Sequence, residues 1–308
     1  MSGVAILCSG QGLQGPAMLD ALTDAPAAAA IFTAARAMLG GEDPRDVVRR
    51  ADERMHDNAV AQILCAVEAM AWWAVLRESV SGPLIVAGYS AGELPAWGLA
   101  GVLDGEAVLR LVARRAAAMD EATTEPCGLA AILGLPHSQV EKICASHRLH
   151  IAIVNGPDHV VVGGRESDLA PGLAAACGEG ARRVVRLAVH VASHTPLLCA
   201  ATRALEPDFT AALGRGPLPP GVRVIAGANG RSVHSREDGA RLLAVQISAV
   251  LRWDAVMDAV NALAPVRVIE LGPGDALARM MAQSCGVDAR STADFRSIVG
   301  VRRWLGRA

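Results

Sequence analysis

Three short strand-like runs in this chain, two of them wholly apolar, each end in a glycine-rich polar loop. They are residues 4–7 before Cys8-Ser9-Gly10-Gln11-Gly12, residues 83–87 before Gly88-Tyr89-Ser90-Ala91-Gly92, and residues 266–271 before Gly272-Pro273-Gly274. The first two runs are continuously apolar, which is typical of strands buried on both faces of a parallel sheet, and the third carries Arg267 and Glu270 among apolar residues. Helical patterns lie between them, including residues 105–120 with Asp104 as a plausible cap. The sequence therefore predicts an α/β fold with a mainly parallel sheet covered by helices.

The middle of the chain has a different pattern of predicted strands and helices. It reads as a strand (128–135), a helix (136–147), a hairpin (151–154 and 159–163), a second helix (166–177) and a last strand (182–189). The order β-α-β-β-α-β is that of a ferredoxin-like unit. We predict a small ferredoxin-like domain, residues 125–191, inserted into a large α/β-hydrolase-like catalytic domain formed by residues 1–124 and 192–308. A cleft between the two is the natural place for a substrate.

Composition narrows the classes of function and the compartment. A chain of 308 residues with 52% hydrophobic and 19% charged residues is typical of an ordered globular enzyme. A net charge of −2 and 3% aromatic residues give no basis for binding nucleic acid or an anionic membrane. The seven cysteines contain no C-x-x-C pair, which indicates reduced thiols in the cytoplasm and neither disulfides nor a metal site. The apolar stretch 59–76 is interrupted by Gln62 and Glu68, so we expect a buried helix there and no membrane span.

Residues 88–92 match the pattern G-x-S-x-G between a predicted strand and a predicted helix. In that context the turn lifts the hydroxyl of Ser90 out of the sheet, and the following helix directs free N–H groups toward it. The sequence therefore predicts Ser90 as a nucleophile. Spacing alone leaves two candidates for the base of this nucleophile, His190 and His194, beside the proposed cleft. No histidine after His234 takes the late position that an α/β-hydrolase would use.

Arg115 lies on the apolar stripe of the helix predicted at 105–120. Its neighbours on that stripe are Val108, Leu111, Val112 and Met119. A buried guanidinium is unfavourable unless a carboxylate or other hydrogen-bond acceptors meet it. In the absence of a ligand, such an arginine either extends past the core to solvent or pairs with an internal acid.

Four motifs together resemble the malonyl-CoA:acyl-carrier-protein transacylases. They are Gly10-Gln11-Gly12, Gly88-x-Ser90-x-Gly92-Glu93, Ser193-His194 and Glu270-Leu271-Gly272-Pro273-Gly274, in the order of that family. The resemblance implies that Ser90 is the nucleophile and that His194, rather than His190, is the base. It also implies an oxyanion hole made by Gln11 and the N–H of Ala91. The remaining implied roles are a malonyl-carboxylate clamp at Arg115, a backbone carbonyl near Arg252 that orients the histidine, and Asn155 and Asn229 near the site.

The implied reaction is ping-pong transfer of a malonyl group from malonyl-CoA to a carrier-protein thiol, with no bound cofactor and no metal. Tyr89 and the segment Leu94-Pro95-Ala96-Trp97-Gly98 look more like the transacylase (epsilon) subunit of malonate decarboxylase. The acceptor in that branch is a carrier subunit with a phosphoribosyl-dephospho-CoA arm, in place of the phosphopantetheine of an acyl carrier protein. The alternatives are a fatty-acid or polyketide-type malonyl transacylase, a serine esterase or thioesterase, and a catalytically silent subunit that docks a carrier protein.

Overall fold

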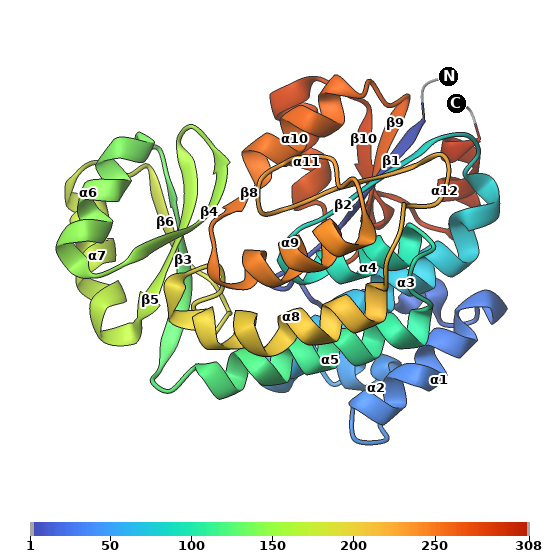
Figure 1. The fold of residues 1–308 in the computed structure, drawn as a ribbon, viewed down its shortest axis with the longest axis horizontal. Coiled ribbons are helices and arrows are strands. Elements are labelled where there is room, and N and C mark those ends of the chain that lie inside the picture. The colour runs from blue at the N-terminus through green and yellow to red at the C-terminus, as the bar shows by residue number, and fades with distance from the viewer. Residues whose placement is uncertain (1–2, 307–308) are drawn as a thin grey trace.

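The computed structural model describes residues 3–306, which form two five-stranded sheets with helices packed around them (Figure 1). The first sheet has the strand order β10-β9-β1-β2-β7, and every neighbouring pair is parallel. Its strands are β1 (Val4–Cys8), β2 (Leu84–Gly88), β7 (Val222–Ile225), β9 (Arg267–Leu271) and β10 (Ala289–Ser291). The α/β fold with a parallel sheet is confirmed, and β1 and β2 are buried along their whole length.

The second sheet has the order β6-β3-β5-β4-β8. Its strands are β3 (Cys127–Leu133), β4 (His150–Gly156), β5 (His159–Arg165), β6 (Arg183–Arg186) and β8 (Leu251–Arg252). Apart from β8, the elements follow the predicted order β3-α6-β4-β5-α7-β6 of a ferredoxin-like unit. A separate apolar cluster, drawn from residues 130–176, fills this unit. The domain limits at 124/125 and 191/192 stay a prediction.

Strand β8 was not expected in the small unit. It comes from the chain between α9 and α10 and pairs in parallel with β4, at Ile153–Leu251 and Val154–Arg252. An edge strand such as β4 presents unpaired backbone groups, and β8 covers part of them. Arg252 N of β8 also donates to Gly227 O at 2.9 Å, so the second sheet is bonded through its backbone to the chain that follows β7 of the first sheet.

The helices of the described chain fall into two groups by position. Those packed around the parallel sheet are α1 (Ala29–Met38), α2 (Pro44–Arg49), α3 (Asn58–Leu76), α4 (Glu93–Leu99), α5 (Gly105–Ala122), α8 (Cys199–Leu213), α9 (Arg236–Ser248), α10 (Trp253–Ala262), α11 (Ala276–Cys285) and α12 (Ile298–Leu305). Those of the small unit are α6 (His137–His147) and α7 (Glu166–Gly178). Asp104 caps α5 by accepting a hydrogen bond from Ala107 N, as predicted.

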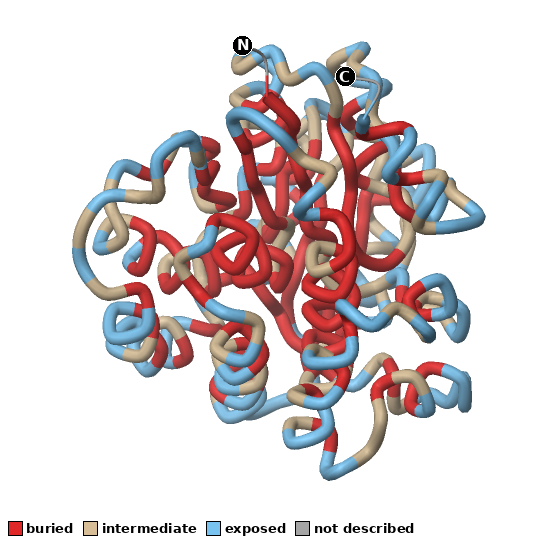
Figure 2. Tube along the Cα trace, turned by 90° about the vertical axis from the view of Figure 1, so that its right-hand side faces the viewer, coloured by how far each residue is buried: buried red, intermediate tan, exposed pale blue. Residues whose placement is uncertain are grey.

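Helix α3 is long and apolar because it lies in the core. By length and composition, the segment Asn58–Ser79 is the one helical stretch within residues 3–306 that could span a membrane. Most of it, 78% of the most apolar window, is buried inside the protein, where it packs against α1, α4 and α5. Figure 2 shows the buried positions gathered at the strands and inner helices, with exposed positions on the outer turns and loops. The prediction of a buried helix at 59–76 is confirmed.

The register of the parallel sheet brings the predicted loops together. Cys8, the last residue of β1, pairs with Gly88 on one side and Leu271 on the other. Because the carboxyl ends of β1, β2 and β9 coincide, the loops that follow them open at one edge of the sheet. The small unit and the end of α9 face the same edge (Figure 1).

Candidate active site

Ser90 lies in a tight turn between β2 and α4. Its φ of 55° is in the left-handed region, which a residue with a side chain adopts only under constraint. The turn closes onto the end of β1, since a Cβ added to Gly92 would lie 2.2 Å from Cys8 O. No residue larger than glycine fits there without moving the backbone. The strand, the glycines and the helix thus fix the position of the Ser90 hydroxyl.

His194 is the histidine that the fold brings to this hydroxyl. Its Nε2 is 2.8 Å from Ser90 Oγ, and the residue is only 1% exposed. Its Nδ1 is 2.5 Å from the backbone oxygen of Gln246, which can only accept. Nδ1 therefore carries the hydrogen, and the lone pair of Nε2 faces the serine. His190, the rival left open by spacing, is exposed to solvent.

The carbonyl that orients His194 belongs to Gln246, and the expectation that placed it near Arg252 is wrong. Gln246 lies in the last turn of α9, where backbone carbonyls lack partners within the helix. Arg252 is six residues further along, in β8. Its side chain is exposed and paired with Asp254 at 2.8 and 2.9 Å.

Sequence reasoning missed a buried pair that fastens Gln246 to the serine turn. Gln246 Nε2 donates to Glu93 Oε2 at 2.7 Å and lies 3.4 Å from Ser90 O. The same Glu93 oxygen accepts a hydrogen bond from Gly227 N at 3.2 Å. Burial raises the pKa of Glu93 to about 8, although the charge of Arg115 acts in the opposite direction. The available signal was Glu93 itself, a carboxylate directly after the G-x-S-x-G turn.

Arg115 points from α5 toward the serine. Its NH1 donates to Gln62 Oε1 at 2.5 Å, and its NH2 is 3.5 Å from Ser90 Oγ. The residue is 2% exposed, yet within residues 3–306 no carboxylate forms an ion pair with it. Burial lowers the pKa of Arg115 to about 10, so the guanidinium remains charged at neutral pH. The alternative of an internal acid paired with Arg115 is not realised.

The loop after β1 runs beside the serine turn. A Cβ on Gly10 would lie 2.7 Å from Tyr89 O and 3.5 Å from Ser90 Cβ. The backbone N–H groups of Gln11 and Ala91 donate to no acceptor within the described residues. Unpaired N–H groups beside a nucleophile can hold the negative oxygen of a tetrahedral intermediate. The Gln11 side chain lies 3.5 Å from Asn58 Oδ1 through its Nε2.

The two predicted asparagines have different surroundings. Asn155, in β4, is 6% exposed, and its Nδ2 lies 3.4 Å from His159 Nε2. The ring of Tyr89 packs edge-on against Trp253, with centroids 5.2 Å apart. Asn229 is exposed, and its Oδ1 accepts from Arg231 N at 3.0 Å. This local turn uses the Asn229 side chain, and a role for Asn229 near the site stays a prediction.

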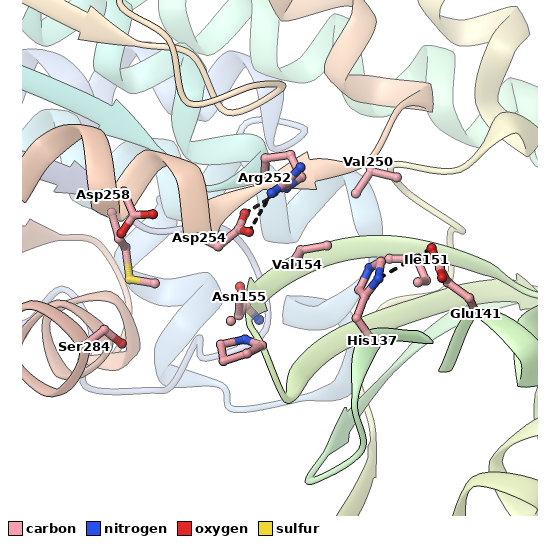
Figure 3. A pocket seen from close by; sticks show the side chains of 13 residues that line it. His137, Glu141, Ile151, Val154, Asn155, Val250, Arg252, Asp254, Asp258 and Ser284 are labelled. Atoms are coloured by element: carbon pink, nitrogen blue, oxygen red, sulfur yellow. Dashed lines mark hydrogen bonds and ion pairs between the residues drawn. The ribbon is translucent and has the colours of Figure 1, made fainter. Parts of the chain in front are cut away.

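A cavity of about 590 Å³ opens beside Asn155, between the β4–β5 hairpin and helices α10 and α11. Figure 3 shows Asn155, Arg252 and Asp254 around it, with the Arg252–Asp254 pair at one side. Apolar side chains of Ile151, Val154 and Met257 form part of its wall. Within the described chain no three His, Cys, Asp or Glu side chains gather as metal ligands.

A serine on a strand-to-helix turn, bonded to a buried histidine, defines the class of α/β enzymes built for acyl chemistry. Residues 6–294 match the acyl transferase domain family, and the chain belongs to that family. It is 28% identical over 293 residues to a malonyl CoA-acyl carrier protein transacylase of Mycobacterium bovis, covering 94% of this chain and 95% of that protein.

Solved structures of such enzymes are similar along their whole length. The malonyl-CoA:acyl carrier protein transacylase of Xanthomonas oryzae superposes with a TM-score of 0.89 at 26% identity, covering 99% of this chain and 98% of that one. A malonyl-transacylase in complex with a type II PKS acyl-carrier protein superposes at 0.88 with 26% identity, covering 98% and 99%. The large α/β domain with a small ferredoxin-like domain is the fold of these neighbours.

Proposed function

We propose that this protein moves a malonyl group from malonyl-CoA to a carrier-protein thiol through an ester on Ser90. Membership of the acyl transferase family and the names of the relatives support the reaction and its partners. The observation that carries the choice of acyl group is the buried cation of Arg115, 3.5 Å from Ser90 Oγ and without an ion-pair partner among residues 3–306. A malonyl ester on Ser90 would bring a carboxylate to this guanidinium, which binds carboxylates through two parallel hydrogen bonds. An acetyl ester has no such group.

In the proposed mechanism His194 acts as general base and then as general acid. Its Nε2 takes the proton of Ser90 Oγ as that oxygen attacks the thioester carbonyl, and the N–H groups of Gln11 and Ala91 bind the oxyanion. The C–S bond breaks, and the sulfur leaves as CoA-SH with the proton from His194. The carrier thiol then gives its proton to His194, and its sulfur attacks the ester. Ser90 Oγ leaves and recovers that proton.

The cavity beside Asn155 is the proposed site for the arm that carries the thioester. Its apolar wall suits the methyl groups of a pantetheine-type arm, and Asn155, which lines the cavity, can hydrogen-bond the arm's amides. Arg252 at the side of the cavity is the proposed contact for the phosphate end of the arm. The substrate-binding role of Arg252 is thus assigned to its side chain rather than to its backbone.

We assign the acceptor to the malonate decarboxylase carrier subunit, on Tyr89 and the Leu94–Gly98 sequence in α4. The alternative acceptor is the carrier of fatty-acid or polyketide synthesis, which the relatives' names favour. Purified carriers of both kinds, offered together to the malonyl-enzyme, decide between them by which carrier gains the malonyl mass. The seven free cysteines support placing the reaction in the cytoplasm.

The test of the acyl-enzyme is intact-protein mass spectrometry after brief incubation with malonyl-CoA or acetyl-CoA. We expect a malonyl adduct on the wild type and none on Ser90→Ala, with little acetyl adduct. Steady release of CoA without an adduct would show a hydrolase instead. Neither adduct nor release would show a silent docking subunit.

A further inference from the structure

A buried chain of side chains leads from Arg115 to the protein surface between α3 and α5. Arg115 NH1 donates to Gln62 Oε1 at 2.5 Å. Gln62 Nε2 donates to Asn58 Oδ1 at 2.7 Å, and Asn58 Nδ2 donates to Asp120 Oδ1 at 2.8 Å. Gln62 and Asn58 are 0% and 7% exposed, whereas Asp120 lies exposed in the last turn of α5. This hydrogen-bonded series of side chains therefore has one end in solvent, at Asp120, and the other beside the nucleophile, at Arg115.

The side-chain amides of Gln62 and Asn58 each have a donor NH2 and an acceptor oxygen. Only one orientation of each amide satisfies all the hydrogen bonds of the series. Arg115 can only donate, so Gln62 must turn its oxygen toward it. Gln62 then donates from its NH2 to Asn58, which must accept through its side-chain oxygen. That orientation leaves the NH2 of Asn58 facing the carboxylate of Asp120 and, at 3.3 Å, the backbone oxygen of Ala116.

Asp120 and Ala116 are the groups that fix this direction at the outer end. An ionised carboxylate and a backbone carbonyl can only accept, so a reversed Asn58 amide would place oxygen against oxygen. A reversed Gln62 amide would place its NH2 against the guanidinium, which would lose its hydrogen-bonded partner in a buried position.

We propose that Asp120 and Asn58 are positioning residues that set the acyl-group specificity of the enzyme by holding Arg115 in place through Gln62. The inference rests on the proposed function, in which Arg115 binds the malonyl carboxylate. Without the Asp120 carboxylate, only the 3.3 Å contact with Ala116 O holds the outer amide, so Asn58 and Gln62 turn more readily and Arg115 is held less firmly toward Ser90. Acetyl transfer does not use the guanidinium and is therefore little affected.

The experiment measures kcat/KM for malonyl-CoA and acetyl-CoA in the wild type, Asp120→Ala, Arg115→Ala and the matched control Glu121→Ala. Glu121 is the exposed acid next to Asp120, and the structure gives it no contact with the chain of amides. We expect Asp120→Ala to lower the malonyl-to-acetyl ratio about tenfold, with acetyl transfer changed less than about twofold. We expect Glu121→Ala to keep the wild-type ratio and Arg115→Ala to lose it.

A second pair of variants separates positioning from general damage. In Asn58→Asp two carboxylates face each other at the outer end, so the ratio should fall. In Asn58→Asp combined with Asp120→Asn, the donor at 120 meets the acceptor at 58, and Gln62 again finds an oxygen. We expect this double variant to recover at least part of the ratio that the single variant loses. Asn58 Oδ1 also lies 3.5 Å from Gln11 Nε2, and Asn58→Asp keeps an acceptor oxygen at that place, so the contact with Gln11 is retained in both variants.

The outcomes distinguish this inference from the proposed function. If the wild type shows no preference for malonyl-CoA, both are overturned. If the wild type prefers malonyl-CoA and Arg115→Ala loses the preference while Asp120→Ala keeps it, only the positioning role is wrong. Equal loss with both acyl groups in Asp120→Ala, or no recovery in the double variant, also overturns it.

Discussion

The surroundings of His194 keep its imidazole neutral. Burial and the nearby charge of Arg115 lower the pKa of His194 from 6.5 to about 3, while the hydrogen bond to Gln246 O acts in the opposite direction. A neutral ring with its hydrogen on Nδ1 already presents a lone pair to Ser90. The same geometry links base and clamp, because a malonyl carboxylate on Arg115 would offset the charge that lowers the pKa of His194.

The neutral imidazole of His194 predicts the pH dependence of the first half-reaction. We expect kcat/KM for malonyl-CoA to change less than about twofold between about pH 5 and pH 6.5, because His194 of the free enzyme is neutral throughout. Rapid-mixing measurement of CoA release gives the profile, and circular dichroism over the same range controls for unfolding. A fall in rate that follows an ordinary histidine pKa near 6.5 would contradict the neutral, buried base.

At the scale of elements, the site is a junction between the end of one helix and the beginning of another. The last turn of α9 offers the Gln246 carbonyl to His194, and the Gln246 side chain binds Glu93 in the first turn of α4. Gln246 thus fixes the position of the base, His194, relative to the turn that carries the nucleophile, Ser90. Glu93 stays uncharged in the folded protein at neutral pH because burial raises its pKa to about 8.

The buried Glu93 predicts a pH dependence of stability. Below its ordinary pKa of 4.5 the carboxyl is protonated in folded and unfolded chains alike, and no stability is lost. As pH rises toward about 8, the unfolded chain releases a proton that the folded chain retains, so this group lowers the free energy of unfolding by about 1.4 kcal/mol per pH unit. Glu93→Gln should remove that contribution. Urea unfolding at several pH values measures the difference between the two proteins, which should grow with pH; parallel curves would mean that Glu93 is already ionised in the fold.

The elements themselves were largely predictable because their signals are local. The strand-like runs before Gly88 and Gly272 predicted β2 and β9, and Asp104 marked the beginning of α5. The Ser90 turn was predictable for the same reason. The partner of His194 was not, since Gln246 is 52 residues away and contributes a backbone oxygen, which no side-chain pattern reveals.

On the scale of the whole molecule, β8 connects the two sheets next to the catalytic pair. It follows the Gln246 turn by five residues and pairs with β4, the strand that carries Asn155. Leu251 of β8 is 0% exposed and packs close to Gly227, whose N–H binds Glu93. Sequence reasoning divided the chain into an insert and a host and therefore had no reason to give the insert a strand from outside.

The position of Leu251, in the strand that follows Gln246, allows the effect of a core substitution on stability to be separated from its effect on kcat. Leu251→Ala and Leu305→Ala each remove buried methyl groups and should each lower stability by about 2–5 kcal/mol. Leu305 lies in α12, and its cavity should leave kcat near the wild-type value. The cavity at Leu251 loosens the strand that follows Gln246, so we expect a further loss of about tenfold in kcat, because a displaced carbonyl no longer aligns His194 with Ser90. Thermal unfolding together with malonyl-transfer kinetics of both variants, at a temperature where both are folded, makes the comparison. Equal kcat values would mean that β8 supports only stability and that the α9–α4 junction keeps its geometry without it.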